Sequence, residues 1–561
     1  MDKNNSLSRR QWLGKITVPA VAAGATMIGL EANATPVNDE KENKLAGAAI
    51  YNVRDHGAKG DGKTLDTAAI QSAIDKCFNE KGGTVLIPAG DFLSGTLELK
   101  SNVTLHITAS GKLLGSPKRE DYTAGKGVPP GNGNIVFLFA VNAHNISIEG
   151  KGTVDGNGLA FYNGKGDNTG PGQNGVGGNF DRPHLFIFYQ CDNLHLQNTF
   201  FKASAYHCVR ILKCKQVYID GIRIYNRVNR NNDGFHFNDC GYVHVMNCDV
   251  QCQDDACALF GSNKFVTITN CSFSTRWSIF RFGGGESQNI AVTNCLIYDT
   301  YGCPIKISAG KASIENFTFS NIIMHNVTGP IGIGFSGPSN NSNNNTQDTS
   351  KPFIRNIVFN AIRATVVAKP IDHPDIHFGV TVREGEKNSC ITLNAMGEYY
   401  LENISFTDVH VKYAGGGTTE QASKVVPNEA AEYFGVWNYA PGGPPAYGMY
   451  ARNVKGLSLQ NVRFEYDEPD ARPAIIFDNV EDATIIGLSA KGNPGNELLR
   501  FVNSKDVLLT ATRLLTPSAI FLLVEGASSR DITVNGGDIQ KAKQSLVADK
   551  GALRTAVKIQ V

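Results

Sequence analysis

Apolar and polar residues alternate in short runs along most of the chain, and the runs recur about every 24 residues. The clearest copies are YVHVMNCDVQC from position 242, FVTITNCSFST from 265 and NIAVTNCLIYD from 289. Alternation with a period of two predicts β-strands, which Asn, Gly and Asp interrupt. A repeat this short cannot bury its own apolar face, so we expect each unit to stack on its neighbours.

This repeat predicts an all-β fold, a single-stranded right-handed parallel β-helix with one coil per repeat. Stacked coils align equivalent residues, so that asparagine lies on asparagine and cysteine on cysteine, at Asn247–Cys248, Asn270–Cys271 and Asn294–Cys295. The cysteines then act as small apolar residues of the interior. A β-propeller is the competing repeat fold, but its blades need about 40 residues or more.

Two other features complete this fold. TLDTAAIQSAIDKC (64–77) has helical spacing and a candidate N-cap at Asp66, so we expect a short N-terminal helix that covers the open end of the coils. Its buried face is predicted to hold Ile70, Ala73, Ile74 and Cys77. Long stretches of loop composition at 162–183, 337–352 and 413–427 should project from the sides, where such insertions often wall a groove.

The N-terminus has the features of an export signal. Arg9–Arg10 precede an apolar run at 16–30, and Ala32-Asn33-Ala34 supplies a small-x-small cleavage pattern. We therefore expect a twin-arginine signal peptide at 1–34, a linker at 35–48 and a catalytic β-helix at 49–561. A membrane anchor is the alternative, but the apolar run is short for a span. The mature protein is predicted to be periplasmic or secreted and free of the membrane.

Composition adds few constraints. Lys plus Arg total 53 and Asp plus Glu 52, which gives no reason to expect a nucleic-acid partner. The 12 cysteines would suggest disulfides in an exported protein, but a twin-arginine substrate folds first in a reducing compartment. We expect most of these thiols to be free and buried. The sequence contains no mononucleotide fingerprint, thiolate-zinc pattern or serine nucleophile elbow, so neither a cofactor nor a metal is predicted. A monomer is expected.

Three acidic residues stand in segments that otherwise resemble buried strands. Asp233 lies in NRNNDGFHFNDC (229–240), and Asp254 and Asp255 lie one coil later in QCQDDACALFG (251–261). Stacked strands are about 4.8 Å apart, so the carboxyl groups should cluster and at least one pKa should rise. A neutral acid beside ionised carboxylates is the equipment for splitting a glycosidic bond. Asn-Asp-Gly is also a common turn sequence, so a purely structural turn is the alternative for Asp233.

The motifs resemble those of glycoside hydrolase family 28, the polygalacturonases and rhamnogalacturonan hydrolases. The resemblance is carried by YNVRDHGAKGDGKTLDTAAIQSAI (51–74), NNDG and QDD, and it extends over nearly all the mature chain. The stretches 445–462 and 469–482 are similar to the C-terminal coils of bacterial members. It implies a pectin-lyase-like solenoid that hydrolyses galacturonic-acid-containing pectic polysaccharide with inversion. It also implies that Asp254 is the general acid and that Asp233 and Asp255 position and activate water.

The substrate-binding motifs depart from this family. The Gly-His-Gly of the family is missing from STRWSIFRFGGGES (274–287), and its Arg-x-Lys is reduced to Lys306 with Pro304 in place of arginine. Arg276 or Arg281 could replace the lost cation, or either could be a surface charge or a neighbour of the asparagine ladder. The resemblance therefore predicts an intact acid machinery with an altered sugar subsite.

Further cleft residues and other functions stay open from the sequence. His207 and Tyr301 are candidates to line the cleft, whereas strand alternation should point His236 to the opposite face. The aromatic stretch 432–448 could stack on sugars or form a packed loop. A calcium-dependent pectate lyase, with Arg276 or Arg281 as base, and a non-catalytic β-helical carbohydrate-binding protein are the alternative functions.

Overall fold

The computed structural model describes residues 49–131, 133–162, 182–310, 312–335, 352–371, 386, 388–427 and 443–560. The chain divides into two units, 1–45 and Ala46–Val561, and all described residues belong to the second. The predicted signal peptide and linker lie outside the described residues. Within the described ranges, no helix is both long and apolar enough to cross a bilayer.

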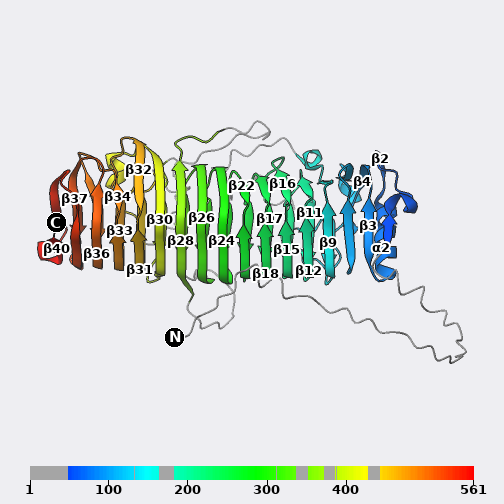
Figure 1. Ribbon diagram of the computed structural model, residues 1–561, viewed down its shortest axis with the longest axis horizontal. Coiled ribbons are helices and arrows are strands. Elements are labelled where there is room, and N and C mark those ends of the chain that lie inside the picture. Colours follow the sequence, from blue (N-terminus) through cyan, green and yellow to red (C-terminus); the bar gives the residue numbers. More distant parts are fainter. Residues whose placement is uncertain are drawn as a thin grey trace, which may run out of the picture. The chain divides into compact units, whose positions relative to one another are not determined.

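The second unit is a parallel β-helix, as predicted. Each strand pairs in parallel with the equivalent strand of the next coil, so strands of successive coils lie side by side (Figure 1). One coil consists of β17 (Phe235–Asn238), β18 (Gly241–Met246) and β19 (Asp249–Cys252). These strands pair with β20 (Cys257–Phe260), β21 (Lys264–Thr269) and β22 (Ser272–Ser274).

The three strands of a coil therefore form three long sheets. The first sheet carries the site described below and contains, besides β17 and β20, β8 (Val136–Val141), β11 (His184–Tyr189), β14 (Val209–Leu212), β23 (Phe280–Gly283), β25 (Ile305–Ala309), β27 (Ile331–Phe335) and β29 (Ile391–Ala395). The second contains β9 (His144–Gly150), β12 (Asp192–Gln197) and β15 (Lys215–Asp220), and the third contains β10 (Thr153–Asp155), β13 (Phe200–Lys202) and β16 (Arg223–Asn226). The second and third strands are then continuous in β24 (Gly285–Thr300), β26 (Ala312–Val327), β28 (Phe353–Val366) and β30 (Leu401–Gly415).

Stacked asparagines hold the bends between strands. The side-chain amide of Asn270 donates to Asn247 at 2.6 Å, and that of Asn321 donates to Asn294 at 2.6 Å. All four have φ between 53° and 56°, a left-handed conformation that asparagine tolerates better than most residues. The 12 cysteines are free and buried, which confirms their predicted interior role.

The predicted cap is helix α2 (Thr67–Asn79), and all four residues expected on its buried face are fully buried. Asp66 occupies the N-cap position, but its carboxylate does not cap the helix. It accepts instead from the backbone amides of Lys59 at 2.7 Å and Gly60 at 2.9 Å. The buried carboxylate therefore fixes the preceding loop rather than the first turn.

The predicted loop at 413–427 contains more structure than expected. Strand β30 continues to Gly415, and helix α3 (Thr419–Ala422) begins with a capping box formed by Thr418 and Gln421. Most of the loops predicted at 162–183 and 337–352 lies outside the described residues.

Candidate active site

The three acidic residues occupy the same turn in adjacent coils, immediately before the first sheet. Asp233 precedes β17, and Asp254 and Asp255 precede β20, whose residues Cys257–Phe260 align with β17 in register. The backbone amide of Gly234 donates to the carbonyl of Asp255 at 2.9 Å. The ladder of parallel hydrogen bonds therefore extends into the turn and holds the acids together.

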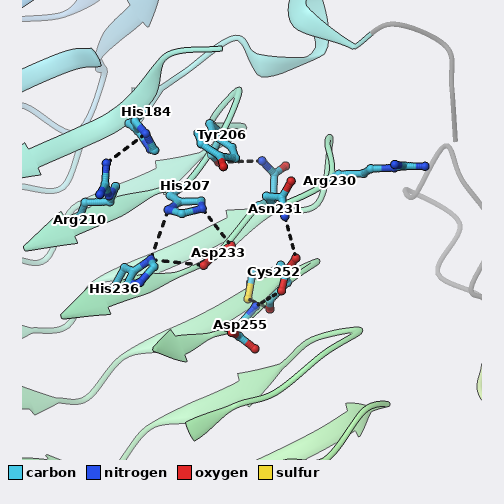
Figure 2. Close-up of polar contacts among 12 residues, drawn as sticks. His184, Tyr206, His207, Arg210, Arg230, Asn231, Asp233, His236, Cys252 and Asp255 are labelled. Atoms are coloured by element: carbon cyan, nitrogen blue, oxygen red, sulfur yellow. Dashed lines mark hydrogen bonds and ion pairs between the residues drawn. The ribbon is translucent and has the colours of Figure 1, made fainter. Parts of the chain in front are cut away.

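Two imidazoles flank Asp233. His207 Nε2 lies 3.7 Å from Asp233 Oδ1, and His236 Nδ1 lies 3.5 Å from Asp233 Oδ2. The two rings also meet at 3.3 Å between their Nδ1 atoms. Figure 2 shows both rings converging on the carboxylate. All three side chains are buried.

The expected orientation of His236 is wrong. The expectation assumed an extended strand from Asp233 to His236, but β17 begins only at Phe235. Asp233 stands in the turn, where alternation does not apply, and both side chains face the same side. His207 lies beside Asp233, one coil before it, and is buried.

The second pair of acids has different hydrogen-bond partners. Asp254 Oδ2 accepts from the side-chain amide of Asn231 at 3.3 Å, and its Oδ1 accepts from the backbone amide of Asp255 at 2.9 Å. Asp255 Oδ1 accepts from the backbone amide of Ser278 at 3.3 Å. Asp254 is partly exposed, whereas Asp255 is buried. Asp254 is thus the acid of this pair that is more open to a ligand.

Burial raises the pKa of all three carboxyl groups. The pKa of Asp233 is raised well above its usual range by burial and then by the charges of Asp254 and Asp255. Burial and the charge of Asp255 raise the pKa of Asp254 to about 7. Burial also raises the pKa of Asp255, although Arg281 and Lys306 oppose the rise. The cluster therefore holds protons at neutral pH that isolated carboxylates have lost.

The imidazoles are shifted in the opposite direction. Burial lowers the pKa of His236 to about 3, with Arg210 contributing. The pKa of His207 is also lowered, by burial first and by neighbouring histidines and arginines second. Both rings are therefore neutral at neutral pH, and each can offer a nitrogen lone pair.

Two of the predicted cations lie beside the acids on the next two coils. His236, Ala258, Arg281 and Lys306 follow one another in register along the outer face of the first sheet. Lys306 Nζ lies 4.9 Å from the centroid of the Trp277 ring. Because the charges of Arg281 and Lys306 both lower the pKa of Asp255, they act directly on the acid pair.

Arg276 and Tyr301 lie differently from the expectation. Arg276 Nη2 forms a buried ion pair with Glu386 Oε1 at 3.4 Å, and its Nη1 donates to the carbonyl of Tyr301. Tyr301 is fully buried, and its hydroxyl accepts from the backbone amide of Ile371 at 3.0 Å. Arg276 is therefore a buried, paired cation rather than a surface charge, and Tyr301 is a buried residue held by hydrogen bonds.

The described part of the aromatic stretch is packed. Tyr447 is buried, and its hydroxyl donates to the carbonyl of Lys491 at 2.7 Å. Residues 428–442 lie outside the described ranges, so the wall expected at 432–442 is not described.

Sequence reasoning missed three neighbours of the acid cluster. The ring of His184 packs edge-on against His207 at 5.0 Å between centroids, and Arg210 Nη1 donates to His184 Nε2 at 3.4 Å. Asn231 binds Asp254, as described above. A signal for His184 was available, because it stands two residues before the first paired core residue of its strand, as His207, Asp233 and Asp255 do.

Known proteins are similar to this chain in sequence and in fold. The model of the family described as glycosyl hydrolases family 28 matches residues 77–430, more than half of the chain. A polygalacturonase of Persea americana is 27% identical over 50% of this chain and 60% of that protein. An exopolygalacturonase of Zea mays is 24% identical over 67% of this chain and 87% of that protein. The chain thus spans less than two thirds of the first relative and most of the second.

A solved structure supports the fold. The family 28 exopolygalacturonase of Yersinia enterocolitica aligns with a TM-score of 0.56 over 78% of each chain, at 20% identity. At this identity the likeness concerns the β-helix alone.

Proposed function

Because the chain belongs to glycosyl hydrolase family 28, we propose that it hydrolyses glycosidic bonds of galacturonic-acid-containing pectic polysaccharide with inversion of configuration. One observation carries the proposal. A partly exposed carboxyl, Asp254, has a pKa of about 7, and it stands beside Asp255, whose ionised form the charges of Arg281 and Lys306 favour. A proton donor and an acceptor of protons are thereby available on one face of the first sheet.

The three acids divide the work as follows. Asp254 in its protonated form gives its proton to the leaving glycosidic oxygen. Asp233 and Asp255, in their ionised forms, hold the attacking water and take its proton as the bond to the anomeric carbon forms. The charges of Arg281 and Lys306 favour the ionised form of Asp255. The cationic character that develops on the sugar in the transition state is then stabilised by the ionised carboxylates.

Cations and imidazoles form the substrate-binding part of this site. Arg281 and Lys306 stand next to the acids along the sheet and bind the carboxylate of a uronic acid residue. Arg281 thereby supplies the cation that is missing at position 304. His207 contacts the sugar on the opposite side of the acids. The family match does not favour the calcium-dependent lyase or the non-catalytic binding protein.

A product assay tests this function. Purified protein is incubated with polygalacturonate, with and without a metal chelator, and the reducing ends and the ultraviolet absorbance are measured. Hydrolysis predicts new reducing ends, no unsaturated product and no dependence on calcium. An unsaturated product that disappears with chelator would replace the hydrolase proposal with a lyase.

The proposal for cellular location rests on the sequence alone. Residues 1–34 serve as a twin-arginine signal peptide, 35–48 as a linker and 49–561 as the catalytic β-helix, which acts as a monomer in the periplasm or outside the cell. Replacement of Arg9 and Arg10 by lysine should retain the precursor in the cytoplasm. Cell fractionation with antibodies against the β-helix measures the distribution, and unchanged export of the variant would refute the signal.

A further inference from the structure

His207, Asp233 and His236 form a cluster with a second chemical capacity. Each residue offers one ligand atom, and the three atoms lie within 4.8 Å of one another. The cluster combines two imidazole nitrogens with one carboxylate oxygen. This ligand set suits zinc, copper, nickel, cobalt and ferrous ions, and it differs from the all-oxygen sites that calcium prefers.

We propose that His207, Asp233 and His236 bind a divalent transition-metal ion of the zinc class, and that the bound ion inhibits the enzyme. The binding part of this inference is independent of the hydrolase activity. The inhibition part rests on the proposed function, because it assumes that Asp233 takes part in water activation.

The distances fit a metal ion. Zinc bonds of about 2.0–2.2 Å to imidazole and carboxylate place the ligand atoms of a tetrahedron roughly 3.3–3.6 Å apart. One ligand atom from each residue lies within 4.8 Å of the other two, and individual contacts of 3.3, 3.5 and 3.7 Å join different pairs of atoms of these side chains. The three residues come from turns and strands of adjacent coils, which limits their movement (Figure 2).

Three protein ligands leave a fourth position for water or for an oxygen of the sugar, as in open zinc sites.

Charges around the cluster act in both directions. The guanidinium groups of Arg182 and Arg210 both act on Asp233 and oppose a cation. The carboxyl groups of Asp254 and Asp255 act on the same residue and favour it.

Inhibition follows from the position of Asp233. A metal bound to its carboxylate occupies the oxygen that would take a proton from water, and it lies where the sugar must approach. Calcium should not compete for the site because two of the ligands are nitrogens.

Binding is measured first, without substrate. The full chain is freed of metal with a chelator, dialysed, and titrated with Co²⁺ by visible absorption and with Zn²⁺ by calorimetry. We expect one ion per chain and the intense visible bands of cobalt with four ligands. His236→Gln and, in a second variant, His207→Gln should weaken binding by about tenfold or more, since each removes a ligand.

Two controls define the site. Asp254→Asn should bind cobalt with the same stoichiometry and the same visible bands, because Asp254 is not a ligand, although the loss of its charge should lower the affinity slightly. His244→Gln, in β18, should also bind normally, since His244 contacts Thr267 on the second sheet. Absence of stoichiometric binding, or equal binding by the natural protein and both cluster variants, would overturn the metal site.

Activity provides the second measurement. Hydrolysis of polygalacturonate is followed in chelator and then with excess Zn²⁺, and the ratio of the two rates is compared among variants. We expect full activity in chelator, at least a tenfold loss with Zn²⁺, and a smaller ratio in His236→Gln. Metal binding without any hydrolysis in chelator would refute the proposed function and leave the metal site. Hydrolysis that Zn²⁺ does not affect, despite binding, would refute the inhibition.

Discussion

The acid cluster has two different sides. On the side of the preceding coil, Asp233 meets two buried imidazoles that burial keeps neutral. On the side of the following coils, Asp255 is under the influence of two permanent cations, Arg281 and Lys306. His236, Arg281 and Lys306 nevertheless occupy the same outer row of the first sheet.

This difference shows how a uniform scaffold gains a direction. Equivalent outward positions of successive coils are about 4.8 Å apart, so the residue type at that position decides whether a coil presents an imidazole or a cation to the ligand. The side with cations suits a uronic acid carboxylate, whereas the side with imidazoles suits hydroxyl groups or a metal ion. The substrate should therefore bind in one orientation, and the predictions below test this asymmetry.

The largest effect is expected at the acid between the two sides. Asp254→Asn removes the proton donor and should lower kcat by about 10²–10⁴-fold. The variant should be at least as stable as the natural protein near pH 7. Because folding raises the pKa of Asp254 to about 7, the contribution of this carboxyl to stability is lost as the pH rises from the ordinary carboxyl pKa towards 7. Asp192→Asn, an exposed aspartate on β12, serves as the control. A variant at position 254 with near-normal kcat would remove Asp254 from the role of acid.

The next effect concerns the side with cations. Lys306→Ala should raise KM for oligogalacturonates by about 10- to 100-fold, because a hydrogen bond to a charged group contributes about 1.5–3 kcal/mol. In the Lys306→Ala variant, methyl-esterified oligogalacturonates should bind almost as well as the unesterified ones, because the lysine no longer recognises the carboxylate. Lys264→Ala, on the second sheet, should leave KM unchanged. If Lys306→Ala raises KM equally for unesterified and methyl-esterified oligogalacturonates, the lysine does not recognise the carboxylate.

The pH dependence separates the acid from its neighbours. The general acid must be protonated, so kcat should fall as pH rises above about 7, by about tenfold per unit. Asp254→Asn should lack this limb in its residual activity. The measurement is kcat at saturating substrate over a series of buffers, and a rate that stays level well above pH 7 would contradict the assignment.

The smallest effect on activity is expected from the scaffold. Asn321→Ala removes the amide contact to Asn294 and places alanine at φ 53°. The free energy of unfolding should therefore fall by about 2 kcal/mol, while kcat is unchanged. Asn321→Gly, which tolerates this φ, should lose about half as much. Denaturant unfolding measures both, and equal losses would show that the left-handed conformation is not the cause.

The fold was predictable because the same alternation of apolar and polar residues recurs about every 24 residues. Alternation defined the strands, and the fixed spacing brought Asp233 to the level of Asp254 and Asp255. The cysteines stacked on one another for the same reason. These inferences depend only on register, which parallel strands preserve.

Features outside the strands were less predictable. The turn before β17 gave His236 an orientation that alternation does not describe. Arg276 pairs with Glu386, 110 residues later in an insertion, and no local pattern indicates that contact. The burial of Tyr301 likewise depends on Ile371 in another coil. Alignment of the residues two positions before each paired core residue, such as Phe186 and Val209, would have found His184.

The central claim is inverting hydrolysis by the three aspartates, and the configuration of the first product tests it most directly. Proton nuclear magnetic resonance follows the anomers as an oligogalacturonate is cleaved, before mutarotation equilibrates them. The account predicts that the first new reducing end has the opposite anomeric configuration to the cleaved bond, and that Asp254→Asn forms none at the normal rate. A first product with retained configuration, or with an unsaturated end, would contradict it.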